Sequence, residues 1–288
     1  MPPQWKILFS TLSTASLLLL LSLLKLSDNR LHLVFCNVGQ GDGILIYQKT
    51  TQVIVDGGPD NSILSCLGRH MPFWDRKIEY VILTNSDLDH YGGLIEVVKR
   101  YKVEGFGTSG VQKEDIEFQT LVKELADRKI PVTNLSEKTD LRAGSMAFDT
   151  VWPKETSVLG ASTFLKGQAV NENSLVFTLS YGSFDALLTG DIIPPGTDEA
   201  VSLARIHLAS LEILKVPHHG SKNGLTKNMV ESARPGLAVV SVGKNNRYGH
   251  PHQETLDLLK GLKTLRTDLN GEIEITTNGK DWSYKTQN

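Results

Sequence analysis

The feature that most constrains this chain is an acidic loop that joins an apolar strand to a helix. The residues Tyr80–Leu83 predict a short buried strand, and Leu94–Val98 predict the first turns of a helix. The loop between them carries Asp87, Asp89 and His90. Carboxylates this close repel each other unless a positive charge or solvent lies between them. The loop therefore predicts a cation site, although either aspartate could instead cap the helix.

The composition indicates a folded protein without a global charge that would attract nucleic acid. Of the 288 residues, 40% are hydrophobic and 22% are charged, as in globular proteins. Because the formal net charge is −2, any contact with DNA or RNA requires a local basic patch. The two cysteines, Cys36 and Cys66, lack the spacing of a zinc motif. One disulfide between them is possible, but we expect two unpaired buried thiols.

A hydrophobic stretch precedes the globular part of the chain. Ile7–Leu26 contains one charged residue, Lys25, and is long enough to cross a bilayer. Its apolar residues surround the helix instead of forming a stripe, which argues against a buried core helix. No small-residue cleavage site follows, so residues 1–30 are interpreted as an uncleaved signal anchor. We expect a membrane-anchored protein with its catalytic domain outside the cytoplasm, although the flanking charges do not set the orientation.

Residues 31–288 are expected to form one domain, because no linker or shift in composition interrupts them. Strand-like segments at 31–38, 44–47 and 52–56 are joined by tight turns, which favours an antiparallel or mixed sheet. The glycine-rich turn 39–43 lacks a phosphate-loop lysine and precedes a strand, which excludes a nucleotide P-loop. The remaining patterns predict helices over 62–69, 114–128, 203–211 and 254–262, strands over 175–179, 186–188, 213–216 and 238–242, and a closing hairpin at Asn270-Gly271.

Metal-ligating residue types follow the predicted strands at several separate places. Strand ends of one sheet system lie along one edge, so we expect these side chains to meet there. Each has an ordinary explanation as well: Asp191 suits a turn, and His250 suits a hydrogen bond to a carbonyl. Their conjunction is harder to explain that way. The residues are Asp56, Asp87, Asp89, His90, Asp191, His218, His219 and His250.

Six spaced segments carry a resemblance to a known family. The segments are Asn37–Asp42, Asp56–Gly58, Asn85–Gly93, Thr189–Asp191, Lys215–Ser221 and Ser241–Pro251. Together they resemble the metallo-β-lactamase-like domain of the ComEC family of competence proteins, over residues 31–288. The resemblance implies an α/β fold, a four-layer αββα sandwich with a metal site at one edge. In ComEC proteins this domain accompanies a multi-helix DNA channel, so a separate channel protein is an expected partner.

The resemblance also implies the metal ligands, with Asp191 as a bridge between two positions. Asn85 stands where the family pattern His-x-Asp-x-Asp-His has its first histidine. An amide oxygen is a weaker ligand for zinc than imidazole. The first metal position, formed by Asp87 and Asp191 with Asn85 as an optional ligand, is therefore expected to bind its ion weakly or not at all. Asn171 or Asn173 lies near another ligand position of related hydrolases. The implied ligands of one or two zinc or manganese ions are Asp87, Asp89, His90, Asp191, His218 and His219.

We therefore expect a metal-dependent hydrolase of a phosphodiester, with DNA as the substrate and DNA uptake as the setting. Asp191, His219 and His250 are the expected catalytic residues, the histidines as proton donors or phosphate contacts. A catalytically degenerate DNA-binding or scaffold module is the alternative, because of Asn85. A lactam, a thioester or another ester fits the motifs less well as a substrate. A local basic patch is expected from Lys215, Lys222, Lys244 and Arg247.

Overall fold

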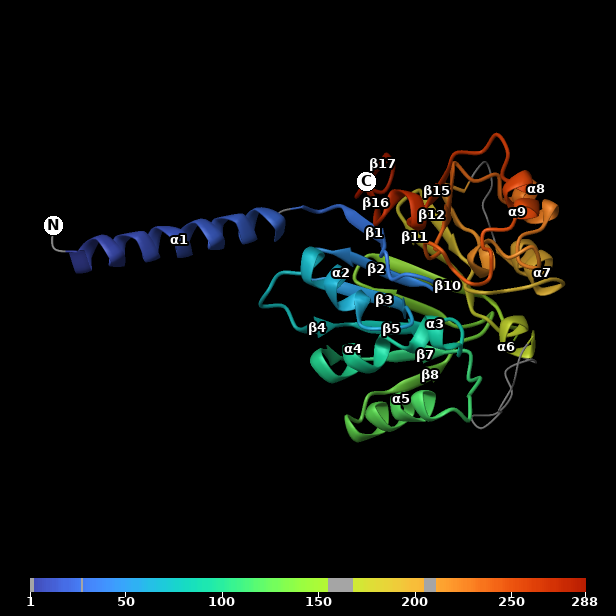
Figure 1. Cartoon of the computed structure of the whole chain (residues 1–288), viewed down its shortest axis with the longest axis horizontal. Coiled ribbons are helices and arrows are strands. Elements are labelled where there is room, and N and C mark those ends of the chain that lie inside the picture. Colours follow the sequence, from blue (N-terminus) through green and yellow to red (C-terminus); the bar gives the residue numbers. More distant parts are fainter. Residues whose placement is uncertain (1–2, 27, 155–167, 205–210) are drawn as a thin grey trace.

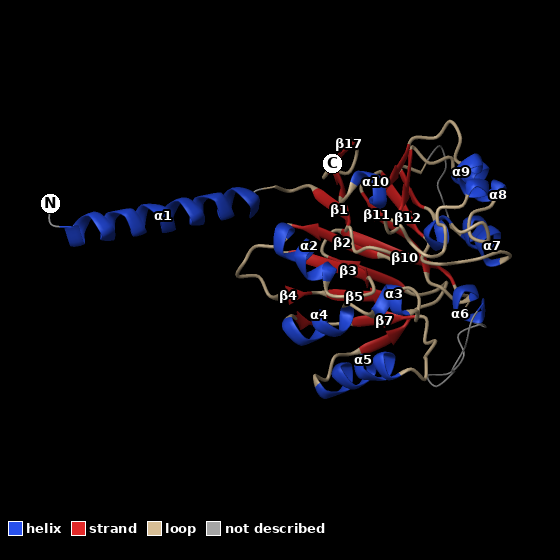
Figure 2. Ribbon diagram, in the orientation of Figure 1, coloured by secondary structure: helices blue, strands red, loops and turns tan. Residues whose placement is uncertain are grey.

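Two β-sheets lie face to face at the centre of the fold, and helices cover both outer faces (Figure 1). The computed structural model describes residues 3–26, 28–154, 168–204 and 211–288. Figure 2 shows the layers directly, with helices outside the two sets of strands. This arrangement confirms the predicted αββα sandwich with a preceding N-terminal helix.

The first sheet contains eight strands drawn from the first half of the chain and from its C-terminal end. In spatial order they are β17 (Trp282–Thr286), β16 (Ile273–Thr277), β1 (Leu31–Phe35), β2 (Gly43–Gln48), β3 (Thr51–Gly57), β5 (Tyr80–Leu83), β7 (Phe106–Thr108) and β8 (Val132–Asn134). The strands from β17 to β3 pair antiparallel. Those from β3 to β8 pair parallel, so the sheet is mixed, as predicted.

The second sheet contains seven strands and is also mixed. In spatial order they are β15 (Thr264–Arg266), β14 (Leu237–Val240), β13 (Ile213–Lys215), β12 (Phe184–Leu188), β11 (Val176–Tyr181), β10 (Met146–Trp152) and β9 (Asp140–Ala143). The strands β9 to β12 pair antiparallel, and β12 to β15 pair parallel. A separate two-stranded sheet pairs β4 (Lys77–Ile78) with β6 (Lys102–Val103).

Helices pack on the outer face of each sheet. The first sheet is covered by α2 (Ser62–His70), α3 (Leu88–Tyr91), α4 (Leu94–Arg100) and α5 (Ile116–Asp127). The second sheet is covered by α7 (Gly196–Leu203), α8 (Lys227–Ala233) and α9 (Gln253–Leu258). The other helices are α1 (Pro3–Leu26), which projects away from the sandwich in Figure 1, α6 (Gln168–Glu172) and α10 (Thr267–Asn270).

The core follows from the alternation of side chains along the strands. On β1, Leu33 and Phe35 point to the layer between the sheets, and Val34 points to the layer under the helices. Phe148 and Phe177, from neighbouring strands of the second sheet, fill the central layer with their rings 5.9 Å apart. Both faces of each sheet are therefore buried, and the polar loops that leave the strands gather at the sheet edges.

The predicted membrane anchor is wrong. The helix α1 covers the stretch Ile7–Leu26, but within the described residues no helix is both long and apolar enough to cross a membrane. The expected position outside the cytoplasm depended on that anchor and is withdrawn with it. Hydroxyl groups interrupt the apolar surface in the first half of α1, where the Thr11 hydroxyl donates to the Leu8 carbonyl. They belong to Ser10, Thr11, Ser13, Thr14 and Ser16.

Cys36 and Cys66 form a disulfide, whereas the sequence favoured two unpaired thiols. Cys36 follows the last residue of β1, and Cys66 lies on α2, with the two Cα atoms 5.9 Å apart. Both side chains are buried, so the bond fastens the first sheet to the helix above it. Spacing along the chain does not reveal this pair, because packing of α2 on the sheet brings the thiols together.

One other predicted element is wrong, and another falls mostly outside the described residues. Most of the helix expected over 203–211 falls on residues 205–210, outside the described residues. Asn270-Gly271 ends α10 and is not the turn of the closing hairpin. Gly271 has a φ of 67°, which glycine adopts readily at the end of a helix. The hairpin between β16 and β17 turns at 278–281 instead.

Removing the disulfide should destabilise the protein without changing the site. The variant Cys36→Ala/Cys66→Ala no longer closes a loop of 30 residues in the unfolded chain. Its free energy of unfolding should fall by about 3 kcal/mol. Chemical denaturation measures the difference, and a reductant should destabilise the parent while leaving the variant unchanged. Equal midpoints for parent and variant would contradict this account.

Candidate metal centre

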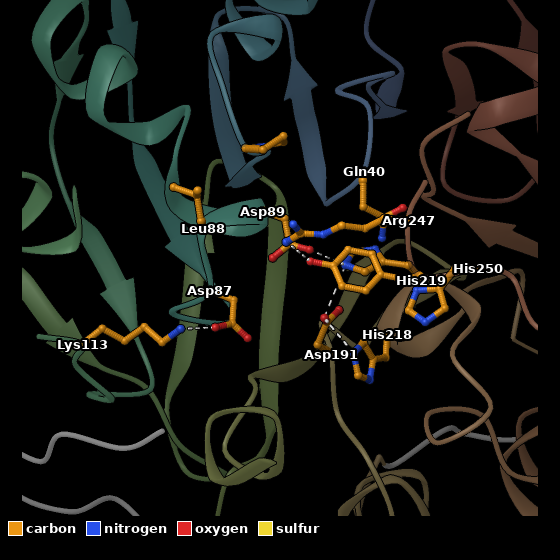
Figure 3. A pocket seen from close by; sticks show the side chains of 12 residues that line it. Gln40, Asp87, Leu88, Asp89, Lys113, Asp191, His218, His219, Arg247 and His250 are labelled. Atoms are coloured by element: carbon orange, nitrogen blue, oxygen red, sulfur yellow. Dashed lines mark hydrogen bonds and ion pairs between the residues drawn. The ribbon is translucent and has the colours of Figure 1, made fainter. Parts of the chain in front are cut away.

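Loops from both sheets meet at one edge of the sandwich and enclose a cavity of about 600 Å³ (Figure 3). The cavity is open enough to admit a ligand, and its wall is dominated by titratable side chains. Among the predicted site residues, His90 does not line this cavity and is fully buried beside Asp191. Six of the predicted site residues line the cavity: Asp87, Asp89, Asp191, His218, His219 and His250.

His90 is held in one orientation by a carboxylate behind it. Its Nδ1 lies 2.9 Å from Oδ2 of Asp56, near the end of β3. Asp56 also accepts a hydrogen bond from the backbone N–H of Thr84, at 2.7 Å. A carboxylate only accepts, so the neutral ring of His90 carries its proton on Nδ1 and presents a lone pair on Nε2. That Nε2 lies 3.2 Å from Oδ2 of Asp191.

His219 is held in the same way from the opposite side. Its Nδ1 lies 3.0 Å from the carbonyl oxygen of Ser241, another group that only accepts. Its Nε2 lies 3.3 Å from Oδ2 of Asp191 and 3.5 Å from Oδ2 of Asp89. The two histidine rings, one from each sheet system, therefore point their Nε2 atoms at the same carboxylate.

The turn Pro217–Gly220 explains how two adjacent histidines take different places. His218 and His219 have φ values of 51° and 53°, in the left-handed region that residues other than glycine rarely adopt. His219 is buried in the cluster, whereas His218 is 23% exposed, with Nε2 3.7 Å from Oδ2 of Asp191. The structure thus brings His219 closer to the carboxylates than His218.

The donor atoms of the cluster fit a divalent cation. In the described part of the chain, Nε2 of His90, Nε2 of His219 and Oδ1 of Asp191 are buried and have no hydrogen-bond partner. Buried polar atoms are normally satisfied, so these three atoms call for another partner. A tetrahedral ion with bonds of about 2.0–2.1 Å separates its ligand atoms by roughly 3.3 Å. Oδ2 of Asp191 lies 3.2 Å from Nε2 of His90 and 3.3 Å from Nε2 of His219, and Oδ2 of Asp89 lies 3.5 Å from Nε2 of His219. These separations agree with that spacing.

Asp42 stands behind both rings and is not among the ligands predicted from the sequence. Asp42, His90, Asp191 and His219 offer donor atoms that all lie within 4.8 Å of one another. However, the Asp42 carboxylate faces the Nδ1 atoms, at 3.8 Å from His90 and 3.6 Å from His219. Its Oδ2 is ion-paired with the buried ammonium of Lys215, at 2.6 Å. Asp42 therefore supports the rings from behind instead of sharing a cation with Asp191.

The glycine-rich turn 39–43 fastens Asp42 to the acidic loop. The backbone N–H of Asp42 donates to the carbonyl of Asp89, at 3.1 Å. Gly41 has a φ of 138°, and a Cβ there would lie 2.1 Å from the same carbonyl oxygen. Only glycine permits this approach. The turn positions an acid, in agreement with the exclusion of a phosphate loop.

A second polar cluster lies across the cavity, and its groups are already paired. The side-chain oxygen of Asn85 accepts from the backbone N–H of Asp87, and its amide donates to Asn171, both at 2.8 Å. Asn171 is thus the asparagine that reaches Asn85, since the Asn173 amide donates to the carbonyl of Ala169 in α6. Asp87 is ion-paired with Lys113 and points toward it in Figure 3, away from the histidine cluster.

Opposing charges set the protonation of the cluster. Burial disfavours the imidazolium of His219, but the carboxylates of Asp191 and Asp42 outweigh it and raise its pKa to about 10. The pKa of His90 is raised in the same way, against burial, by Asp191 and Asp56. The two rings hold the pKa of Asp191 well below its ordinary value, although burial opposes them. A cation entering the cluster must therefore displace protons.

An aromatic and cationic group forms the outer wall of the cavity. The guanidinium of Arg247 donates to the hydroxyl of Tyr248 at 2.8 Å and lies 5.0 Å from the centre of its ring. The same ring stacks on His250, with centroids 5.6 Å apart. Burial and the charge of His219 lower the pKa of His250 to about 4. This wall therefore places a neutral imidazole and a cation close to the cluster.

The predicted basic patch is only partly present. Lys215 is buried and ion-paired, while Lys222 and Lys244 are exposed but do not line the cavity. Arg247 does line it, together with Lys113, which the sequence analysis did not single out. A signal for Lys215 was available, since a charged residue inside the apolar strand-like run at 213–216 requires a buried partner.

The described geometry agrees with a comparison against known protein families. Residues 36–244 match the model of the metallo-beta-lactamase superfamily. The chain belongs to the metallo-β-lactamase superfamily. This superfamily contains metal-dependent hydrolases, and its fold binds divalent metals. The histidine and aspartate cluster is the candidate site for one in this chain.

Curated relatives narrow the kind of superfamily member. The chain is 27% identical over 258 residues to ComE operon protein 3 of Bacillus subtilis (strain 168), covering 83% of this chain and 32% of the relative. It is 24% identical over 250 residues to Recombination protein 2 of Haemophilus influenzae, covering 83% and 28%. The chain thus spans about a third of the length of these relatives. The resemblance to the ComEC family is confirmed.

Solved structures share the metallo-β-lactamase fold. The metallo-beta-lactamase fold protein YhfI from Bacillus subtilis superposes with a TM-score of 0.53 at 11% identity, covering 82% of this chain and 96% of YhfI. CmlA, a diiron beta-hydroxylase from Streptomyces venezuelae, gives a TM-score of 0.50 at 14% identity, covering 87% and 54%. At these identities the likeness concerns the fold alone.

Removing the carboxylate behind His90 should weaken cation binding without removing a ligand. We expect Asp56→Ala to raise the Kd for manganese by about 10–100-fold, because the His90 ring loses the partner that fixes its tautomer and orientation. The manganese Kd of Asp56→Asn should lie between those of Asp56→Ala and the parent. The exposed Asp60→Ala is the matched control in the same loop and should bind like the parent. Calorimetric titration of all four proteins measures this, and parent-like affinity in Asp56→Ala would contradict it.

Cation affinity should also fall as the pH is lowered. Because the pKa of His219 is about 10 without a metal, its Nε2 is protonated at any lower pH, and each unit of decrease favours the proton further. Between pH 8 and pH 6 we expect the manganese affinity to fall by about tenfold per unit for each displaced proton. Titrations in buffers of different ionisation enthalpy should show proton release. A Kd that does not change over this range would refute the expectation.

Proposed function

We propose that this superfamily member is a metal-dependent phosphodiesterase that cuts DNA in the course of DNA uptake. The observation that carries the proposal is the convergence of buried metal-ligating side chains from His90, Asp191 and His219 at the edge of a cavity. Positive side chains stand on two sides of that cavity, at Lys113 and Arg247. A cation site between fixed positive charges suits an anionic ester better than a neutral one.

In this proposal the cation is held by Nε2 of His90, Nε2 of His219 and the carboxylates of Asp191 and Asp89. A divalent cation bound there would lower the pKa of a water and polarise a phosphoryl oxygen. Asp191 is the residue that both rings share, so it is the proposed centre of the ligand set. Asp87 is left out of this set, because its carboxylate is paired with Lys113 in place of the cluster.

His218 and His250 are the proposed groups for proton transfer and phosphate contact. Their ring centroids lie 5.7 Å apart on the cavity wall. Nδ1 of each ring is buried and lacks a hydrogen-bond partner among the residues that the structure describes. Each ring can therefore form a hydrogen bond with a substrate oxygen or with a water at the cluster.

Tyr248 is a proposed contact for a base of the DNA strand. Its side chain is 47% exposed, and its ring contacts both Arg247 and His250 on the cavity wall. Aromatic rings next to an arginine bind bases of single strands by stacking, without strong sequence preference. This arrangement supports a single-stranded substrate over a lactam or a thioester.

A specific observation favours a second candidate function, a DNA-binding or scaffold module of the same fold. Asn85 and Asp87 are engaged with Asn171 and Lys113, so one of the two expected metal positions has no free donor among them. If the remaining position does not support turnover, DNA would be bound and not cut. The number of bound cations per chain separates the two functions. Less than one zinc or manganese ion per chain would favour the binding module.

Further partners are proposed from the family relationship. We propose that a separate competence channel protein works with this chain, because the resemblance to the ComEC family implies one. We also propose that residues 31–288 act as one functional unit, apart from residues 1–30. The two sheets share one core made of strands from both halves of that range, which supports this division.

The proposed function predicts cleavage of a labelled single-stranded DNA oligonucleotide in the presence of manganese or zinc. We expect Asp191→Ala to lower the cleavage rate by at least about a thousandfold, because both rings lose their common partner and the cation its central ligand. A chelator should abolish cleavage, and added manganese should restore it. The exposed Asp257→Ala is the matched control and should cut like the parent. An Asp191→Ala protein as active as the parent would disprove the assignment.

A further inference from the structure

The cavity contains two clusters with opposite hydrogen-bonding states. In the histidine cluster, three donor atoms are buried and without hydrogen bonds among the described residues. In the cluster of Asn85, Asp87 and Lys113, each group has a partner. The Asn85 amide uses its oxygen on the backbone N–H of Asp87 and its nitrogen on Asn171, and the Asp87 carboxylate is ion-paired with Lys113.

We propose that Lys113 takes the place of a second divalent cation and binds a phosphate oxygen of the ligand directly. A divalent cation beside Asp87 would have to displace the Lys113 ammonium or lie next to it. Two positive charges in contact with the same carboxylate repel each other strongly. The Asn85 oxygen would also have to leave its backbone hydrogen bond. The site is therefore built for one divalent ion and one fixed ammonium. The ligand class, a phosphate ester, rests on the proposed function.

The position of Lys113 suits this role. Its side chain is 23% exposed and lines the cavity, so the ammonium is held by Asp87 yet open to a ligand. An ammonium has three donors, and one bond to Asp87 leaves two for a phosphate. Arg247 lines the same cavity, so an anion in it would meet positive charge from two separate elements.

The geometry also distinguishes this idea from a simple loss of one ligand. If Asn85 alone prevented a cation from binding beside Asp87, a histidine in place of Asn85 would restore that metal position. If Lys113 occupies the position, the histidine alone does nothing, because the ammonium still neutralises Asp87. Both changes together are then needed to admit a second ion.

The first test counts manganese ions bound to the full chain by equilibrium dialysis and elemental analysis. The parent, Lys113→Met and Asn85→His should each bind one equivalent, and Asn85→His/Lys113→Met should bind two. Two equivalents in the parent or in Asn85→His would overturn the proposal, and so would one equivalent in the double variant. Lys123→Met, which removes an exposed lysine from α5, is the matched control and should bind one equivalent.

The second test measures binding of inorganic phosphate to the manganese-loaded chain. We expect Lys113→Met to weaken phosphate binding by about tenfold, because a charge-assisted hydrogen bond is lost. Lys113→Arg and Lys123→Met should bind phosphate like the parent, and the arginine variant shows that the position tolerates substitution. Unchanged phosphate affinity in Lys113→Met would overturn the proposal. A chain that passes both tests but cuts no DNA would refute the proposed function alone, and a DNA-cutting chain with two ions would refute this inference alone.

Discussion

The buried ion pair between Asp42 and Lys215 is the interaction on which the rest of the site depends. Lys215 lies on β13 of the second sheet, and Asp42 lies in the turn that precedes β2 of the first. The ammonium also donates to the carbonyl of Gly190, directly before Asp191. A charge that lost its partner in this interior would cost several kcal/mol, on the order of 3–5. The two sheets must therefore meet in one register, and that register brings the loops of His90, Asp191 and His219 together.

This arrangement places two histidine rings against one buried carboxylate at the proposed metal site. The rings of His90 and His219 face one carboxylate, Asp191, and each is fixed from behind by a group that only accepts hydrogen bonds. Without a cation, the cluster is held together by protons on the rings. With a cation, the same donors need no protons and the lone pairs are used. In the proposed metal-bound state, the fold would position the ligands in advance, so that little reorganisation would accompany binding of the ion.

Much of the site could be predicted from sequence because the relevant side chains follow strands directly. The acidic loop after β5, Asp191 after β12 and His219 after β13 all lie at one edge, and the fold that the six motifs implied is confirmed. Roles that depend on partners far along the chain could not be predicted this way. The disulfide of Cys36 and Cys66 requires knowing where α2 packs, and the pairing of Asp87 with Lys113 requires the path of the chain between β7 and α5. The membrane anchor was expected from the length and apolar residues of 7–26, and the described part of the chain contains no helix that could cross a membrane.

The central claim is that side chains of both sheets share one cation through the Nε2 atoms of His90 and His219. Anomalous diffraction from crystals grown with zinc, collected on both sides of the zinc absorption edge, tests it most directly. The account predicts a peak within about 2.0–2.2 Å of both Nε2 atoms and of an Asp191 oxygen. A peak bound only to surface residues, or to the Nδ1 side of either ring beside Asp42, would contradict it.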